Sequence, residues 1–178
     1  MLLSLDVGFA AMGWVLFDQG EIYDCGVIRT EKTQKKNTRV ADDHAHRSAV
    51  LAEQLRRIIQ TNKVKGIIGE LPSGGALSAK AMAFMASATS IVAAVGALMV
   101  CPMEWTTPGE VKKVLAGHRS ASKEIMMAKA AEMFGFKEEG KKFFMDGESF
   151  NKGDFEHIAD AIGVYVALKN DNLVKMFG

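Results

Sequence analysis

The sequence predicts an α/β fold with a mixed central sheet, in which three antiparallel strands are followed by parallel strands and helices cover both faces. Two observations lead to this prediction. The first third of the chain consists of short apolar runs separated by turn residues, and the remainder alternates helix-length apolar patterns with short apolar runs. The chain has 178 residues, 48% of them hydrophobic, and no obvious linker divides it, so we expect one domain over residues 1–178.

The first third predicts a three-stranded antiparallel meander. Its strands are expected at Leu2–Asp6, Met12–Asp18 and Glu21–Thr30. The first connection is a hairpin with the carboxylate of Asp6 at its turn, where Gly8 lets the backbone pass close to a ligand. Gln19 and Gly20 form the tight connection between the second and third strands.

The rest of the chain alternates helices and strands. We expect helices at about Arg39–Asn62, Ser78–Leu98, Thr107 onward, Ser120–Phe134 and Gly153–Ala167, and strands at Val64–Glu70 and Cys101–Trp105. Thr107 and Glu110 form a capping box around a first-turn proline. Ser120 is expected to cap the next helix and Gly135 to end it. The segment Phe136–Lys152 is rich in Gly, Lys and Phe, and we predict an irregular structure there.

Carboxylates end two of the predicted strands, and further polar groups lie on the last helix. Asp6 ends the first strand, and Glu70 ends a short apolar strand directly before a Pro- and Gly-rich segment. The spacing of three places His157 and Asp160 on one helix face. Such oxygen donors with one imidazole suit two cations about 4 Å apart, which activate water for in-line attack on a phosphodiester. The four residues therefore predict a two-metal site.

Other acids were weighed as metal ligands. Asp154 and Glu156 lie near His157, but Asp154 is also well placed to cap the helix, so we treat it as a reserve ligand. A second group of acids and histidines comprises Asp42, Asp43, His44 and His46. Acids near a helix start favour the helix dipole and both histidines can be solvated, so we do not predict a metal site there.

Taken in order and spacing, these motifs resemble the RuvC-type Holliday junction resolvases, a family with the RNase H-like fold. The match to the family's first strand and turn consists of Asp6, Gly8, Gly13 and Trp14. Glu70 matches the family's strand-end glutamate, and the segment 157–161 matches its C-terminal acidic helix, where the first position is Asp or His. The resemblance covers most of the chain. It implies a structure-selective endodeoxyribonuclease that resolves four-way junctions as a homodimer by paired nicks.

The resemblance also assigns two lysines and a metal. The segments 111–114 and 120–123 look like the family's lysine-bearing DNA contacts, which implies that Lys112 and Lys123 hold or neutralise the cleaved phosphate. Asp6 would bridge two Mg²⁺ ions, Glu70 and Asp160 would complete their shells, and His157 would ligate the ion that activates water. Nitrogen ligation makes Mn²⁺ a plausible substitute.

Two segments depart from the usual bacterial pattern of this family. They are the long insert before the last helix and the loop after Glu70, and they favour a phage or prophage member. The family places an aromatic residue just after the glutamate to disturb base stacking. The present chain has Leu71, Pro72 and Ser73 there, so an aromatic wedge is missing.

The helix Ser78–Leu98 is the candidate homodimer surface. It carries small residues that let a partner helix approach, namely Ala79, Ala83, Ala86, Ser90, Ala93, Ala94 and Ala97, with Met82, Phe84, Met85 and Met99 as adaptable filler. Packing inside the same chain is the alternative. The apolar stretch Ala76–Val100 contains Lys80 and much Ala and Gly, so we expect a buried helix and no membrane span.

Bulk charge does not indicate a nucleic-acid partner, because the formal net charge is only +1. Basic residues nevertheless cluster at Lys32, Lys35, Lys36 and Arg39, at Lys112, Lys113, His118, Arg119 and Lys123, and at Lys137, Lys141 and Lys142. Beside a predicted metal site these clusters favour phosphate contact. Cys25 and Cys101 lack metal-site spacing and no signal peptide is recognisable, so we expect a reduced cytoplasmic protein, in a bacterial host if phage-encoded.

Two other functions fit parts of the pattern. Actin-like kinases and chaperone ATPases also begin with an apolar strand, Asp and Gly. They need two such domains, and this chain has no second Gly-rich phosphate loop. The other alternative is a branched-DNA-binding protein of the same fold that does not cut DNA. Against it, unused buried carboxylates would repel one another at a cost in stability.

Overall fold

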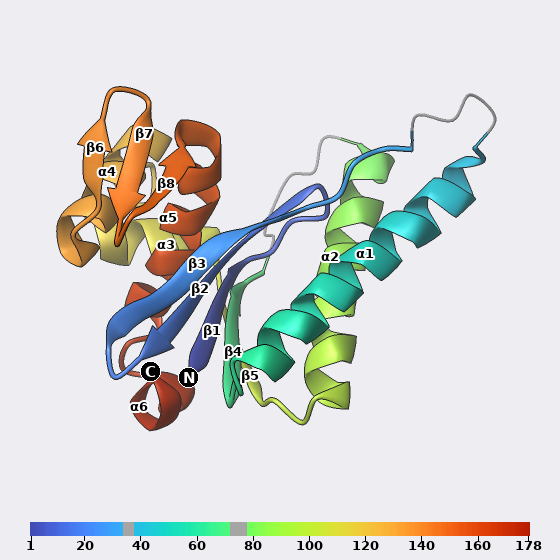
Figure 1. The fold of residues 1–178 in the computed structure, drawn as a ribbon, viewed down its shortest axis with the longest axis horizontal. Helices are drawn as coiled ribbons and strands as arrows, with labels where there is room; N and C mark the ends of the chain where they lie inside the picture. The colour runs from blue at the N-terminus through green and yellow to red at the C-terminus, as the bar shows by residue number, and fades with distance from the viewer. Residues whose placement is uncertain (34–37, 72–77) are drawn as a thin grey trace.

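A five-stranded sheet with helices on both faces forms the body of the protein (Figure 1). The structure is a computed structural model in which residues 1–33, 38–71 and 78–178 are described. In spatial order the strands are β3 (Glu21–Arg29), β2 (Ala11–Asp18), β1 (Leu2–Asp6), β4 (Gly66–Glu70) and β5 (Met103–Thr106). β1, β2 and β3 pair antiparallel, whereas β1 with β4 and β4 with β5 pair parallel. The predicted mixed sheet is therefore confirmed.

The helices form two layers. They are α1 (Val40–Thr61), α2 (Ala79–Leu98), α3 (Pro108–Ala116), α4 (Lys123–Phe134), α5 (Lys152–Ala167) and α6 (Asn172–Phe177). α1 and α2 lie on one side of the sheet, and α3, α4 and α5 lie on the other (Figure 1). The short helix α6 was not predicted, because six residues are too few to show a helical period.

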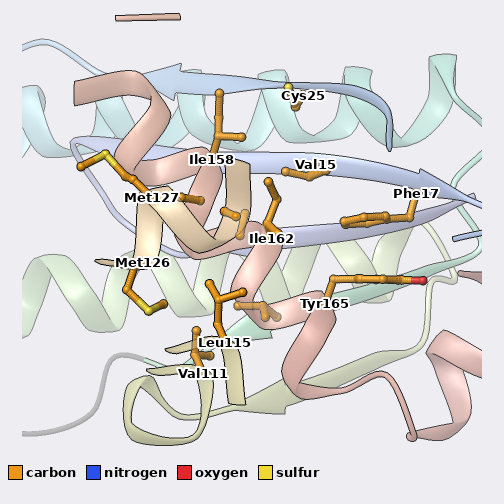
Figure 2. Close-up of a cluster of buried hydrophobic side chains, with 14 of the residues drawn as sticks. Val15, Phe17, Cys25, Val111, Leu115, Met126, Met127, Ile158, Ile162 and Tyr165 are labelled. Carbon is orange, nitrogen blue, oxygen red and sulfur yellow. The ribbon is translucent and has the colours of Figure 1, made fainter. Parts of the chain in front are cut away.

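Strand alternation divides the core into two clusters. Leu2 of β1 belongs to the cluster beneath α3, α4 and α5, whereas Leu3 and Leu5 belong to the cluster beneath α1 and α2. Figure 2 shows Ile158, Ile162 and Tyr165 of α5 against Val15 and Phe17 of β2 in the first cluster. Because side chains alternate along a strand, Ser4 and Asp6 share the α5 face with Leu2.

The segment predicted to be irregular is instead a small antiparallel sheet. Its strands are β6 (Lys137–Glu139), β7 (Lys142–Met145) and β8 (Glu148–Asn151). The second turn is made by Asp146 and Gly147, both at positive φ, which is the Asp-Gly hairpin signal that our prediction overlooked. Phe143 of β7 stacks on Phe155 of α5 with ring centroids 3.9 Å apart, so this sheet is anchored to the helix that follows it.

Helix caps confirm two predictions and correct two. Thr107 and Glu110 form the expected capping box, and Gly135 ends α4 in the left-handed conformation. The cap of α4 is Ser122, whose hydroxyl accepts a hydrogen bond from the Ile125 amide, and Ser120 lies outside the helix. α5 is capped by Asn151, which accepts from the Asp154 amide at 2.9 Å, so Asp154 is a first-turn residue and the predicted cap was wrong.

Candidate metal-binding site

The site is built first by the parallel pairing of β1 and β4. Leu5 pairs with Gly69, so Asp6 and Glu70 leave the sheet together at the carboxyl ends of neighbouring strands. Parallel strands place their carboxyl ends at one sheet edge, where side chains can converge on a ligand. The segment after Leu71 includes the breaker cluster and part of the wedge position, and residues 72–77 lie outside the described part of the chain.

Two contacts dock α5 on the sheet beside Asp6. The buried Ser4 hydroxyl donates a hydrogen bond of 2.6 Å to the Ala161 carbonyl in the middle of α5. Gly13, the register partner of Asp6, lies against the backbone of His157 so closely that a Cβ there would overlap the His157 carbonyl. As a result His157 Nδ1 and Asp6 Oδ2 are 2.7 Å apart.

Burial and mutual repulsion perturb the carboxylates. Burial, reinforced by the charges of Asp6 and Asp160, raises the pKa of Glu70 to about 8. Burial, reinforced by the charges of Asp6 and Glu156, raises the pKa of Asp160 to about 7. Glu70 and Asp160 therefore both lie within electrostatic reach of Asp6. Asp6 thus pairs with His157, ends its strand beside Glu70, and interacts through charge with both Glu70 and Asp160.

The hydrogen bond to Asp6 raises the pKa of His157. Asp6 and His157 pair with each other, so His157 Nδ1 becomes available to a cation only when the pair separates. Over residues 1–33, 38–71 and 78–178, no three His, Cys, Asp or Glu side chains form a compact metal-binding group. The chemistry of the set still fits a hard divalent cation, since three carboxylates that repel one another in a half-buried place are stabilised by added positive charge.

The two predicted lysines flank this acidic cluster. The charge of Lys112 lowers the pKa of Glu70, which places that amine near the end of β4. Lys123, the first residue of α4, is ion-paired with Glu156 of α5, and its charge lowers the pKa of Asp160. Both lysines are therefore near the predicted ligands, and Lys123 already has a carboxylate partner.

The other weighed acids are engaged elsewhere. Asp154, the reserve ligand, accepts a hydrogen bond of 3.1 Å from Arg29 Nε at the end of β3. In the second acid and histidine group, Asp43 accepts from the Thr33 amide at 2.6 Å and His44 lies 2.9 Å from the Ser87 hydroxyl. Both side chains therefore have hydrogen-bond partners within the protein.

Sequence reasoning missed a buried arginine that supports the turn carrying Asp6. Arg47 donates a hydrogen bond of 3.1 Å to the Thr30 hydroxyl, which in turn donates to the Phe9 carbonyl at 2.6 Å. The Arg47 guanidinium also lies 4.8 Å from the centre of the Phe9 ring. Its spacing of four from Leu51 was the available signal, because Arg47 continues the buried stripe of α1.

The outer helix α2 is more exposed than predicted. Only 22% of the residues in its most apolar 18-residue stretch are buried, so the expectation of a buried helix was wrong. The small residues Ala79, Ala83, Ala86, Ser90, Ala94 and Ala97 are exposed along it. They do not form intrachain core, although Ala93 is half-buried. By length and composition alone this helix could also cross a membrane.

Comparisons with known proteins agree on the fold. A structure of Thermus thermophilus RuvC in complex with a Holliday junction substrate is 16% identical to this chain, with a TM-score of 0.67 over 93% of this chain and 90% of that one. A further Thermus thermophilus RuvC structure is also 16% identical, with a TM-score of 0.67 over 98% and 95%. No protein-family model matches the sequence, and no curated protein matches it. The chain thus has the RNase H-like fold of the RuvC structures, which confirms the predicted resemblance as one of fold.

Proposed function

We propose that the protein is a metal-dependent, structure-selective endodeoxyribonuclease that resolves Holliday junctions and related branched DNA. The observation that carries the proposal is that Asp6 pairs with His157 and ends its strand beside Glu70, with Asp160, Lys112 and Lys123 in electrostatic reach of these carboxylates. The fold shared with RuvC supports it, since one of those structures holds a Holliday junction substrate. A phage or prophage origin and a cytoplasmic location remain predictions from the sequence.

The chain's residues have separable tasks in this reaction. Mg²⁺ ions, with Mn²⁺ as a substitute, would be held by Asp6, Glu70, His157 and Asp160 and would supply the Lewis acid that activates water. The repelling carboxylates give the site its affinity for cations. Lys112 and Lys123 orient the scissile phosphate and offset its charge. Their electrostatic attraction for the phosphate is strongest where the half-buried site excludes water.

We further propose a homodimer, with α2 as its interface. A four-way junction has two equivalent strands to cut, so paired nicks require two sites related by a twofold axis. The stripe of exposed small residues on α2 lets a second helix approach closely, and Leu98 at its end is 82% exposed. These features support a partner helix, because residues 1–33, 38–71 and 78–178 leave this face largely uncovered.

The test is a cleavage assay on a mobile four-way junction beside forks, flaps and linear duplex, with Mg²⁺ or Mn²⁺. Asp6→Asn, Glu70→Gln and Asp160→Asn should each lower the nicking rate by more than about 100-fold, since even outer-shell changes cost 10–100-fold. Junction binding should persist, because each change removes charge and little packing. Glu138→Gln, on the exposed strand β6, is the matched control and should nick normally.

Three outcomes would redirect the proposal. Wild-type protein that binds junctions tightly but never nicks them is the branched-DNA-binding alternative. Normal nicking by any one of the three site variants would remove that residue from the site. Loss of binding together with nicking would indicate that the bound cations also dock the DNA.

A further inference from the structure

The ion pair between Lys123 and Glu156 joins two helices beside the acidic cluster. The residues are 33 apart in the sequence, with Lys123 at the start of α4 and Glu156 directly before His157 on α5. Ser122 caps α4 through the Ile125 amide, so the backbone that carries Lys123 is fixed. Only the long side chain of Lys123 is left to be positioned, and Glu156 is its partner.

The amine is held where it acts on the predicted ligands. The hydrogen bond to Glu156 raises the pKa of Lys123, and the charges of Asp160 and Asp6 add to this effect. The charge of Lys123 in turn lowers the pKa of Asp160. The Lys123 side chain is 68% exposed, whereas that of Glu156 is 26% exposed. A half-buried carboxylate thus anchors a solvated ammonium whose four-carbon stem would otherwise sample many rotamers.

The stability of the fold does not require this pair. Exposed ion pairs contribute roughly 0–1 kcal/mol to stability. α4 is already attached to the core through Met126, Met127 and Ala130, which are buried in the cluster that includes α5. The Lys123–Glu156 ion pair contributes little to stability, yet it connects α4 with α5 beside the acidic cluster. We therefore expect a functional role for this pair.

We propose that Glu156 is a positioning residue that holds the Lys123 amine at the acidic cluster, ready to donate to the scissile phosphate. This inference rests on the proposed function. An ammonium has three donors, so Lys123 can bond to Glu156 and to a phosphate oxygen at once. Glu156 also places a negative charge near the DNA, so it weakens binding of the phosphate while it orients the amine.

Under this proposal, Glu156→Gln should strengthen junction binding and slow nicking. Binding of the junction without divalent metal should tighten by about two- to threefold, because a negative charge near the backbone is removed. The maximal nicking rate with Mg²⁺ should fall roughly tenfold, because the amine is no longer held in place. A merely structural role would weaken both, and Glu156→Asp should recover part of the rate.

A double-mutant cycle isolates the pair. In a Lys123→Ala background, Glu156→Gln should change the nicking rate by less than about twofold, since the group it positions is gone. Glu132→Gln is the matched control, because it breaks the Lys129–Glu132 ion pair farther along α4 and should leave nicking and binding unchanged.

The outcomes separate this proposal from the proposed function. An equal loss from Glu156→Gln in both backgrounds, or no loss in either, overturns the positioning role while the nuclease stands. Weaker binding and slower nicking together, with a lowered melting temperature, assign Glu156 to folding instead. A wild-type protein that does not nick overturns both the proposed function and the role of Glu156.

Discussion

The two faces of the central sheet are used differently. On the α5 face, β1 presents Leu2, Ser4 and Asp6 in sequence, so an apolar contact, a hydrogen bond to the helix and a predicted ligand follow one another along one strand. On the opposite face the same strand presents Leu3 and Leu5, which are fully buried beneath α1 and α2. Because side chains alternate along β1, the predicted ligand lies on one face of the sheet and the purely apolar contacts lie on the other.

The helices that cover these faces differ in the same way. α5 is packed against the sheet and against α3 and α4, and eight of its residues are buried. α2 has four buried residues in a longer helix, and its outer side is small and apolar. The difference indicates that the α5 layer is complete within one chain, while the α2 layer is suited to a further partner. The following predictions test this contrast.

Among the changes that test this contrast, the largest effect is expected at His157, on the α5 face. His157→Ala should lose most nicking activity with Mg²⁺ and with Mn²⁺, whereas His157→Asp should retain activity with Mg²⁺ and show less preference for Mn²⁺. A helix-surface histidine without a role would tolerate both changes. Nicking rates of both variants in each metal decide between these cases, and full activity of His157→Ala would leave a site of carboxylates alone.

The next effect tests how closely α5 must approach the sheet. In Gly13→Ala the new methyl group would overlap the His157 carbonyl, so helix and strand must separate. We expect a loss of about 1–3 kcal/mol in the free energy of unfolding and a large fall in nicking. Gly109→Ala is the control, since its Cβ would have no neighbour nearer than 3.7 Å. Denaturant unfolding and nicking rates measure both, and a stable, active Gly13→Ala would contradict the close packing.

A smaller effect concerns pH in the metal-free protein. The pKa of Glu70 is raised to about 8 and that of Asp160 to about 7. At pH values between the ordinary pKa of each carboxyl group and its raised pKa, the folded state binds more protons than the unfolded state. Stability therefore falls as pH rises through this window. The raised pKa of His157 acts in the same direction, since its stabilising pair with Asp6 is lost as the imidazole deprotonates.

The measurement is the melting temperature in EDTA and in Mg²⁺ at several pH values. The melting temperature in EDTA should decrease toward pH 8, and Mg²⁺ should raise it most at that end, because the ligands are then deprotonated. Glu70→Gln should flatten the pH dependence and reduce the effect of Mg²⁺. A Mg²⁺ effect that is equal at all pH values, or unchanged in Glu70→Gln, would exclude this residue as a ligand.

The smallest effect on the folded chain is expected on the α2 face. Ser90→Arg lies on the exposed stripe, so the free energy of unfolding of the monomer should change by less than about 0.5 kcal/mol. The same change should dissociate the proposed dimer, because a long charged side chain prevents close approach of two helices. Sedimentation with Ser149→Arg on β8 as control gives the oligomeric state, and a wild-type monomer would remove the interface.

The sequence by itself determined the order of elements and the identity of the candidate ligands. Apolar runs of strand length predicted the meander, and acids at strand ends followed by turn residues identified Asp6 and Glu70. These signals are local, since strand period, helix period and capping boxes are properties of adjacent residues. Some errors were local too, because the hairpins of residues 137–151 are short and the caps at Ser122 and Asn151 compete with nearby polar residues. The wrong expectation that α2 is buried was not local, because burial depends on tertiary packing.

Only the tertiary structure decided how the ligands meet and which charges are already paired. His157 faces Asp6 because Gly13 admits the helix backbone, and Lys123 reaches Glu156 because α4 packs on α5. The raised pKa values of Glu70 and Asp160 likewise arise from burial and from neighbours distant in the sequence. Such properties depend on distances between elements and on exclusion of water, which no local pattern of residues specifies.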